Sequence, residues 1–172
     1  MRLVKASLEP PPGLEELLSQ LGEGENGFVG TGQPANTESL GAYVQSLVDM
    51  ANGINLRPDW VPMTTHWLLD DNERIIGVSR LRHSLTPSLL VDGGHIGYYV
   101  LPLERGKGYG TALLRLTLIE ARRYGIERAL LTVDSDNEPS IRVIERNGGV
   151  QEDERVDADG IPYRRYWIDL TS

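Results

Sequence analysis

A run of alternating glycines restricts this chain more than any other feature of its sequence. Gly106, Gly108 and Gly110 lie between an apolar strand pattern and a long helical pattern, with the basic residues Arg105 and Lys107 beside them. Glycines remove side chains where a ligand must approach the backbone, and the free amides at the start of a helix point at one spot. The turn is therefore expected to bind phosphate, and the two basic residues add positive charge.

The spacing of these glycines excludes two common phosphate-binding motifs. A P-loop needs a serine or threonine after its Gly-Lys pair and a glycine five positions earlier, and the segment Gly106–Gly108 meets neither condition. A dinucleotide fingerprint would need glycine or alanine in place of Thr111 or Leu113. The pattern that remains is Q/R-x-x-G-x-G/A, which begins at Arg105.

The spacing of apolar residues predicts an α/β (α+β) protein with a mixed, mostly antiparallel sheet flanked by helices. The expected order is β-α-α-β-β-β-α-β-α-β-β, and the length of 172 residues predicts one domain over residues 1–172. Residues 22–32 and 84–94 are expected to be connections. Strands are expected at 2–8, 64–69, 74–81, 95–100, 128–134, 150–156 and 161–170, and helices at 14–21, about 37–52, 109–124 and 138–146.

Composition excludes several classes of protein. The chain has no cysteine, which removes disulfides and thiolate zinc sites, and no two of its three histidines have metal-binding spacing, so no metal site is expected. A net charge of −8 argues against nucleic-acid binding. No run of about 18 apolar residues predicts a membrane span, and the N-terminus lacks a signal-peptide pattern, so a cytoplasmic protein is expected.

The charges are unevenly distributed along the chain. Residues 1–60 carry eight acidic residues, Glu23 and Glu25 among them, against three basic ones. From residue 105 onward, eleven basic residues nearly balance twelve acidic ones. This asymmetry favours a cationic ligand for the N-terminal part and an anionic ligand for the C-terminal part, although an acidic solubilising surface explains it equally well.

Two further segments extend the glycine pattern into a family resemblance. Val100-Leu101-Pro102 precedes the turn, and Asn137-Glu138-Pro139-Ser140 opens the helix that follows the next strand. With these two segments the chain resembles the GNAT superfamily of acyl-CoA-dependent N-acetyltransferases. The resemblance implies acetyl-CoA as cosubstrate, a primary amine of a small molecule or peptide as acceptor, and a homodimer. The acidic N-terminal part then favours a cationic amine.

The resemblance also implies positions for the cosubstrate. The pantetheine arm would lie like an added strand beside Val100, and Asn137 would hydrogen-bond it, with Ser140 nearby. Asn137 can also cap the helix that follows it. The pyrophosphate would lie on the amides of Arg105, Gly106, Lys107, Gly108, Tyr109, Gly110 and Thr111.

The chemistry needs a base for the amine and a donor for the thioester carbonyl. A backbone N–H near Val100 and Leu101 can polarise the carbonyl. Family bases often lie about six residues upstream of the position that Val100 occupies, so His95 is the predicted base, given a one-residue bulge. His83 is the second candidate, and His66 is expected to pack in the core.

One position departs from the family pattern. Many relatives use a tyrosine in the second helix to protonate the departing thiolate, and Ile144 stands there. Tyr98, Tyr99 and Tyr163 are candidate replacements, and the thiolate can also leave unaided. The departure keeps an alternative open, a non-catalytic acyl-CoA-binding sensor with the same fold. A phosphate-binding module for another nucleotide is a third possibility.

Overall fold

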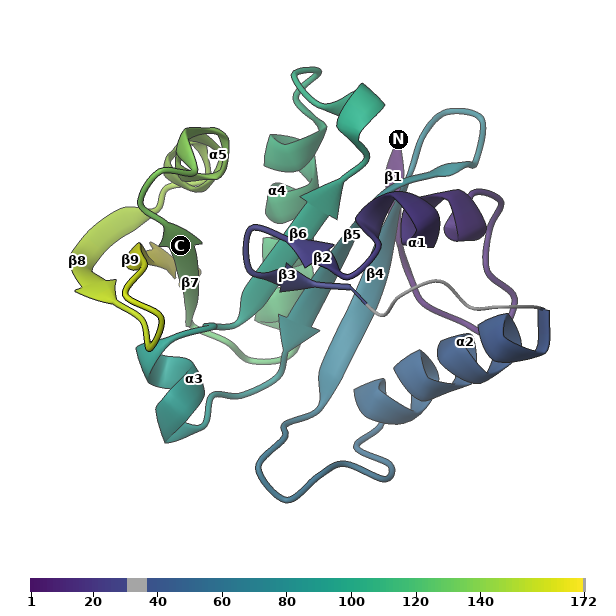
Figure 1. The fold of residues 1–172 in the computed structure, drawn as a ribbon, viewed down its shortest axis with the longest axis horizontal. Coiled ribbons are helices and arrows are strands. Elements are labelled where there is room, and N and C mark those ends of the chain that lie inside the picture. Colours follow the sequence, from purple (N-terminus) through teal and green to yellow (C-terminus); the bar gives the residue numbers. More distant parts are fainter. Residues whose placement is uncertain (31–36, 172) are drawn as a thin grey trace.

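The computed structural model describes residues 1–30 and 37–171 (Figure 1), without the side chains of residues 37 and 38. Short connections join most of its strands and helices. In chain order the elements are β1 (Arg2–Lys5), α1 (Leu14–Leu21), β2 (Gly24–Glu25), β3 (Phe28–Val29), α2 (Thr37–Ala51), β4 (Met63–Leu69), β5 (Ile75–Arg82), α3 (Pro87–Val91), β6 (Ile96–Val100), the 3-10 turn η1 (Pro102–Glu104), α4 (Tyr109–Arg123), β7 (Arg128–Asp134), α5 (Glu138–Arg146), β8 (Val150–Val156) and β9 (Pro162–Asp169).

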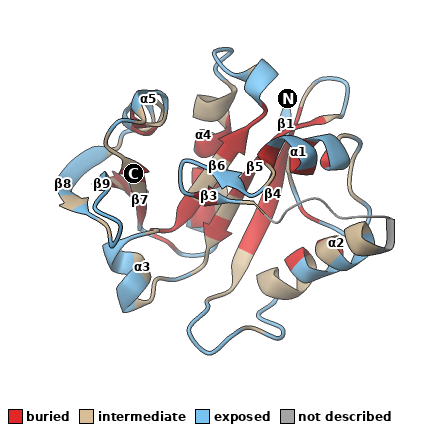
Figure 2. Cartoon of the chain, in the orientation of Figure 1, coloured by how far each residue is buried: buried red, intermediate tan, exposed pale blue. Residues whose placement is uncertain are grey.

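The long strands form two antiparallel sheets. One has the order β1-β4-β5-β6 and the other the order β7-β9-β8. Strands β4 and β5 lie inside the first sheet and are almost wholly buried, as the red ribbons of Figure 2 show. The predicted α/β fold class, with its mostly antiparallel sheet and flanking helices, is confirmed.

Two segments that the sequence predicted as connections contain regular structure. Residues 22–32 include the short hairpin β2–β3, and residues 84–94 include α3, whose first turn is capped by the Thr86 hydroxyl accepting from the Leu89 N–H at 3.2 Å. Two-residue strands and a five-residue helix are too short for the apolar periodicity that prediction relies on. The first strand also ends at Lys5, before the predicted boundary.

The two faces of β5 meet different helices. Ser79 faces α4, because its hydroxyl lies 2.7 Å from that of Thr117, and a Cβ at Gly77 would meet Leu113 of α4. Val78, one position along, packs instead in the cluster that contains Leu17 of α1 and other residues of α1 and α2. In Figure 1, α1 and the β2–β3 hairpin lie in front of the first sheet and α4 lies behind it. Strand alternation therefore assigns residues 78, 80 and 82 to the front face.

Candidate functional site

The two sheets meet at one end of β6 and β7. The His95 N–H donates to the Leu130 carbonyl at 2.7 Å, and the Leu130 N–H donates to Nδ1 of His95 at 2.9 Å. Gly94 makes this approach possible, since a Cβ there would lie 2.4 Å from the Leu130 carbonyl oxygen. No ladder pairing joins β6 to β7 within the described part of the chain, so the two strands are free to separate beyond this junction.

A cavity of about 820 Å³ opens where the strands separate. Its walls come from β6, β7, the start of α5, α3, the β2–β3 hairpin and α2. Of the predicted cosubstrate residues, Asn137 and Ser140 line it, whereas Val100 and those of the glycine turn do not. The cavity is thus large enough for a drug-sized ligand and has polar groups at several points of its wall.

The glycine turn has the backbone geometry that anion binding requires. Gly106 and Gly108 have φ values of 77° and 84°, in the left-handed region that favours glycine, and nothing lies within 4 Å of a Cβ built on either. The first helical bond of α4 runs from the Ala112 N–H to the Gly108 carbonyl at 3.1 Å. The amides of residues 109–111 therefore have no acceptor within the helix and remain available to a ligand.

The basic side chains of the turn are paired with acids, which corrects the expectation that they add net positive charge. Arg105 donates to both carboxylate oxygens of Glu25 on β2, at 2.9 and 2.8 Å, and its Nε donates to the Val100 carbonyl at 3.0 Å. This bidentate pair lowers the pKa of Glu25. Lys107 pairs with Glu104 at 2.8 Å. The turn's affinity for an anion therefore depends on its amides.

Asn137 occupies the N-cap of α5, where its side-chain oxygen accepts from the Ser140 N–H at 3.3 Å. Its amide nitrogen has no partner among the residues that the structure describes, and the residue lines the cavity. Capping and ligand binding are therefore compatible at this position, as the sequence indicated.

His95 is placed as a structural residue. It is 8% exposed and does not line the cavity, and its Nδ1 lone pair is used by the Leu130 N–H. Burial, with a smaller contribution from the charge of Arg82, lowers its pKa to about 4. A neutral histidine has one ring nitrogen that can accept a proton, and in His95 this nitrogen already accepts from the Leu130 N–H. The geometry therefore gives no support to the predicted base near neutral pH.

The other two histidines also lie outside the cavity wall. Nε2 of His83 lies 2.7 Å from the Thr64 hydroxyl, and its ring stacks on Tyr124 with centroids 3.9 Å apart. His66 is buried, as predicted, and desolvation lowers its pKa to about 4.

Charged side chains that the sequence did not single out line the cavity. Arg80 and Arg82 project from the front face of β5, and Asp92, Asp134 and Asp157 also line the wall. Burial and the neighbouring carboxylates of Asp136, Asp157 and Asp92 raise the pKa of Asp134. The only available signal was the Arg-Leu-Arg alternation at 80–82, which any strand with one polar face also shows.

Most of the acidic residues that led to the expectation of a cationic ligand lie outside the cavity wall. Glu23 and Glu25 do not line the cavity, and Glu25 is neutralised by Arg105. Of the described acidic side chains in the first 60 residues, Asp59 alone is part of the wall. The net charge of a segment thus gave no guide to the charge of the cavity.

Two of the three candidate tyrosines reach the cavity. The hydroxyl of Tyr98 donates to the Ser140 carbonyl at 3.3 Å, and burial raises its pKa to about 12. The hydroxyl of Tyr163 donates to the Val91 carbonyl at 3.1 Å. Tyr99 does not line the cavity and stacks on Phe28, which does, and Ile144 also lines the cavity although it is 1% exposed.

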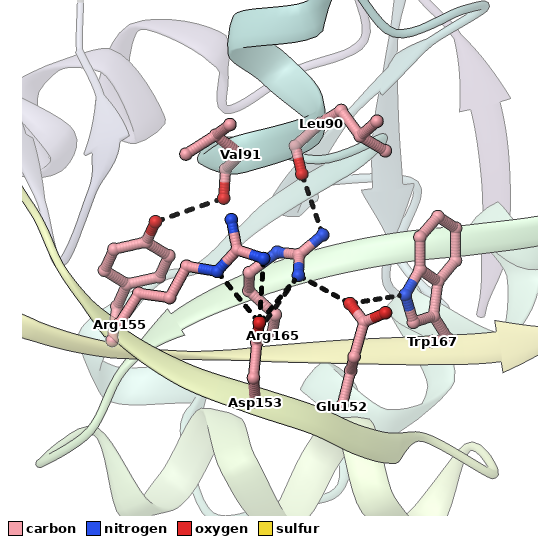
Figure 3. Close-up of polar contacts among 8 residues, drawn as sticks. Leu90, Val91, Glu152, Asp153, Arg155, Arg165 and Trp167 are labelled. Carbon is pink, nitrogen blue, oxygen red and sulfur yellow. Dashed lines mark hydrogen bonds and ion pairs between the residues drawn. The ribbon is translucent and has the colours of Figure 1, made fainter.

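A polar cluster fixes α3, one wall of the cavity, to the second sheet (Figure 3). Arg165 of β9, whose side chain is 5% exposed, donates to Glu152 at 2.5 Å and to Asp153 at 3.1 Å. Its other terminal nitrogen donates to the Leu90 carbonyl at 2.9 Å. Arg155 reaches the same Asp153 from a more exposed position, and the cluster as a whole links β8, β9 and α3.

Neither a metal site nor a membrane span is found in the described residues. No three histidine or acidic side chains there are grouped to hold a metal ion. No helix there is long and apolar enough to cross a bilayer.

Solved structures with the same fold cover nearly the whole chain. A variant of spermidine N-acetyltransferase SpeG from Vibrio cholerae aligns with a TM-score of 0.68 and 13% identity over 99% of this chain and 96% of that one. A GNAT-family acetyltransferase from Streptococcus pneumoniae gives 0.66 and 16% over 98% of both chains. A Salmonella typhimurium protein solved with its cofactor acetyl-CoA gives 0.55 and 20% over 80% of this chain and 76% of that one.

No curated protein sequence matches the chain. At these identities the structural neighbours establish the fold. The family follows from the sequence model of the Acetyltransferase (GNAT) family, which matches residues 34–149. This match includes the glycine turn, the junction of β6 and β7, and the helix that begins after Asn137. It covers well over half of the chain, which therefore belongs to the GNAT acetyltransferase family.

Proposed function

We propose that this protein transfers an acetyl group from acetyl-CoA to a primary amine of a small molecule or peptide. The observation that carries the proposal is the cavity between β6 and β7, which lies beside Asn137 and has carboxylates on its wall. The family match supports acetyl-CoA as cosubstrate. In the reaction the amine nitrogen bonds to the thioester carbonyl carbon, the carbon–sulfur bond breaks, and coenzyme A leaves as a thiolate.

Backbone amides of β6 are the proposed donors to the carbonyl and to the pantetheine arm. The Leu101 N–H donates to the Ile76 carbonyl of β5 at 3.0 Å, so Leu101 is not the donor that the sequence suggested beside Val100. Because successive amides along a strand alternate in direction, those of Tyr98 and Val100 point away from β5, toward the gap before β7. These two amides can polarise a carbonyl placed in the gap.

Asp134 is the proposed acceptor of the ammonium proton, directly or through water. It lines the cavity at the end of β7, and its raised pKa makes its carboxylate a better base than an exposed aspartate. The leaving thiolate needs no dedicated acid, since a thiol has a pKa of about 8.5. His95 remains available as an alternative base only through a change in its contact with Leu130.

The proposal is tested by thiol release from acetyl-CoA with a panel of primary amines. Asp134→Asn should lower kcat about 100-fold while acetyl-CoA affinity stays unchanged, because the substitution removes a proton acceptor and keeps the shape. Asp159→Asn, an exposed aspartate in the β8–β9 turn, should behave like the wild type. Binding of acetyl-CoA without thiol release by any amine would contradict the proposal and favour the non-catalytic sensor.

We also propose that residues 1–172 form one catalytic domain, which the near-complete coverage by the SpeG structure supports. The homodimer and the cytoplasmic location stay predictions.

A further inference from the structure

Two arginines on the front face of β5 project into the cavity. Arg80 and Arg82 are two positions apart on one strand, so their side chains lie on the same face, and both line the cavity wall. Arg80 is directly opposite Gly97 of β6 in the ladder. Gly97 has no side chain, and the Phe28 ring lies over it and under the guanidinium of Arg80.

The guanidinium of Arg80 is held in place by neutral groups. One Nη donates to the Val29 carbonyl at 2.5 Å, and its Cζ lies 4.4 Å from the centroid of the Phe28 ring. The phenol of Tyr43 is its other polar neighbour. A guanidinium has five N–H donors, and among the described residues Val29 and Tyr43 accept from that of Arg80, so further donors of fixed direction remain for a ligand.

Arg82 is oriented in the same way. One Nη donates to the carbonyls of Gly93 and Gly94, at 3.2 and 2.9 Å. The negative charge of Asp92 acts on Arg82 and opposes the effect of burial on its pKa. The Asp92 carboxylate also accepts from the Thr132 hydroxyl at 3.2 Å. Burial lowers the pKa of both Arg80 and Arg82.

The described ion pairs include neither arginine of β5. By contrast, Arg105 is paired with Glu25, and the buried Arg165 is paired with Glu152 and Asp153. Placing a permanent positive charge in a partly buried position without a counter-ion costs free energy. The partners of Arg80, namely Val29, Phe28 and Tyr43, are neutral, so an anionic ligand in the cavity would supply it with a counter-ion.

We infer that Arg80, with Arg82 beside it, binds a carboxylate of the acceptor, so that the acceptor is an amine that also carries a carboxylate, such as an amino acid or a peptide. This inference rests on the proposed function. Planar bidentate pairing suits a guanidinium and a carboxylate, and the carboxylates of Asp134 and Asp157, which also line the cavity, suit the ammonium group. The cavity therefore matches a zwitterion better than the purely cationic amine that segment charge favoured.

Matched amines test the inference. Each pair contains a carboxylate and its primary amide, namely glycine and glycinamide, glutamate and glutamine, and a dipeptide and its C-terminal amide. A series of ω-amino acids of increasing length is compared with the alkylamines of equal length. For the wild type we expect kcat/KM to be roughly 10- to 100-fold higher for the carboxylate member of at least one pair, the range of a charge-assisted hydrogen bond.

Variants of Arg80 then test whether this residue produces the preference for the carboxylate member. Arg80→Gln should lower kcat/KM for the carboxylate member roughly 10- to 100-fold more than for the neutral member and so remove the preference, and Arg80→Lys should keep part of it because the charge is kept. Arg128→Gln is the matched control, since Arg128 also stacks on an aromatic ring, Trp167, at 4.8 Å, but outside the cavity wall. Acetyl-CoA affinity, measured in each variant, shows that the cosubstrate site is intact.

The outcomes are distinct. Acetylation of neutral amines as fast as of their carboxylate partners, or a preference that survives in Arg80→Gln, would overturn the inference and leave the proposed function standing. No acetylation of any amine while acetyl-CoA binds would overturn both. Should Arg80→Gln fail to fold, the wild-type preference together with its partial retention in Arg80→Lys decides the question.

Discussion

Gly94, just before β6, packs against the backbone of β7 at Leu130. Its φ is 60°, and an added Cβ would lie 2.4 Å from the Leu130 carbonyl oxygen, a backbone atom that cannot rotate away. We expect Gly94→Ala to lower the free energy of unfolding by about 2–4 kcal/mol. Gly160→Ala, with φ of 83° and nothing within 4 Å, should cost only the left-handed strain of about 1 kcal/mol. Equal losses in chemical denaturation would show that the close approach is absent.

Because His95 is buried and neutral, we expect the free energy of unfolding to fall at acidic pH. Its pKa is about 4 in the folded chain and about 6.5 when unfolded, so the unfolded chain binds an extra proton between these values. The stabilisation is complete above pH 6.5 and falls as the pH drops toward 4. Between pH 7 and pH 5 the loss should be about 2 kcal/mol.

His95→Asn keeps a side-chain acceptor for the Leu130 N–H and cannot titrate. Denaturation at pH 7 and pH 5 should therefore show a smaller decrease in this variant than in the wild type, with the contribution of His66 common to both. If His95 were instead the base, the variant would lose kcat and keep the wild-type acid sensitivity.

Single residues differ in how far sequence could assign them. The glycine turn was predictable because its chemistry is local, and Gly106 and Gly108 have the expected backbone. Arg80 and Asp134 were not, because a charged side chain acquires a role only from what folds over it. His95 shows the converse, since spacing alone placed it near the site and its bond to Leu130 gave it another role.

At the scale of elements, Arg165 determines the position of α3. We expect Arg165→Met to lower the free energy of unfolding by about 1–3 kcal/mol, because it removes a buried donor from the Leu90 carbonyl and from two acids, which keep only the donors Arg155 and Trp167. It should also raise the acceptor KM several-fold, since α3 contributes Leu89 to the cavity. Arg155→Met removes only a half-exposed pair with Asp153 and should cost less than about 1 kcal/mol. An unchanged KM in Arg165→Met would show that α3 keeps its place without this anchor.

Long elements were predicted well and short ones were not. Strands such as β7, at Arg128–Asp134, match their predicted bounds because each has a full apolar period. The β2–β3 hairpin and α3 were not predicted, and both form walls of the cavity. Their conformations depend on tertiary contacts, such as Arg105 with Glu25 and Arg165 with Leu90.

At the scale of the whole molecule, bound acetyl-CoA should contact both sheets and stabilise the folded protein against unfolding. At about 100 times Kd, binding adds about 2.7 kcal/mol, or a rise in Tm of roughly 5–11 °C for a chain of this size. ATP and NAD should produce no comparable rise. Gly108→Val should abolish the shift, because a branched side chain would occupy the anion position.

Gly125→Val is the matched control, since Gly125 has φ of 75° and open space at the other end of α4. It should be destabilised like Gly108→Val and still respond to acetyl-CoA. A full shift in Gly108→Val would mean that the turn does not contact the cosubstrate.

The alternation along β5 has a consequence for how such a protein can diverge. Ser79 faces Thr117 in the packing against α4, and its neighbour Arg80 faces the cavity. A single inserted or deleted residue would exchange the two faces, placing a guanidinium in the core and a serine in the cavity. The gene can therefore acquire a new acceptor by point substitution at positions 80 and 82, while a change of length within the strand would disrupt the core and the selectivity together.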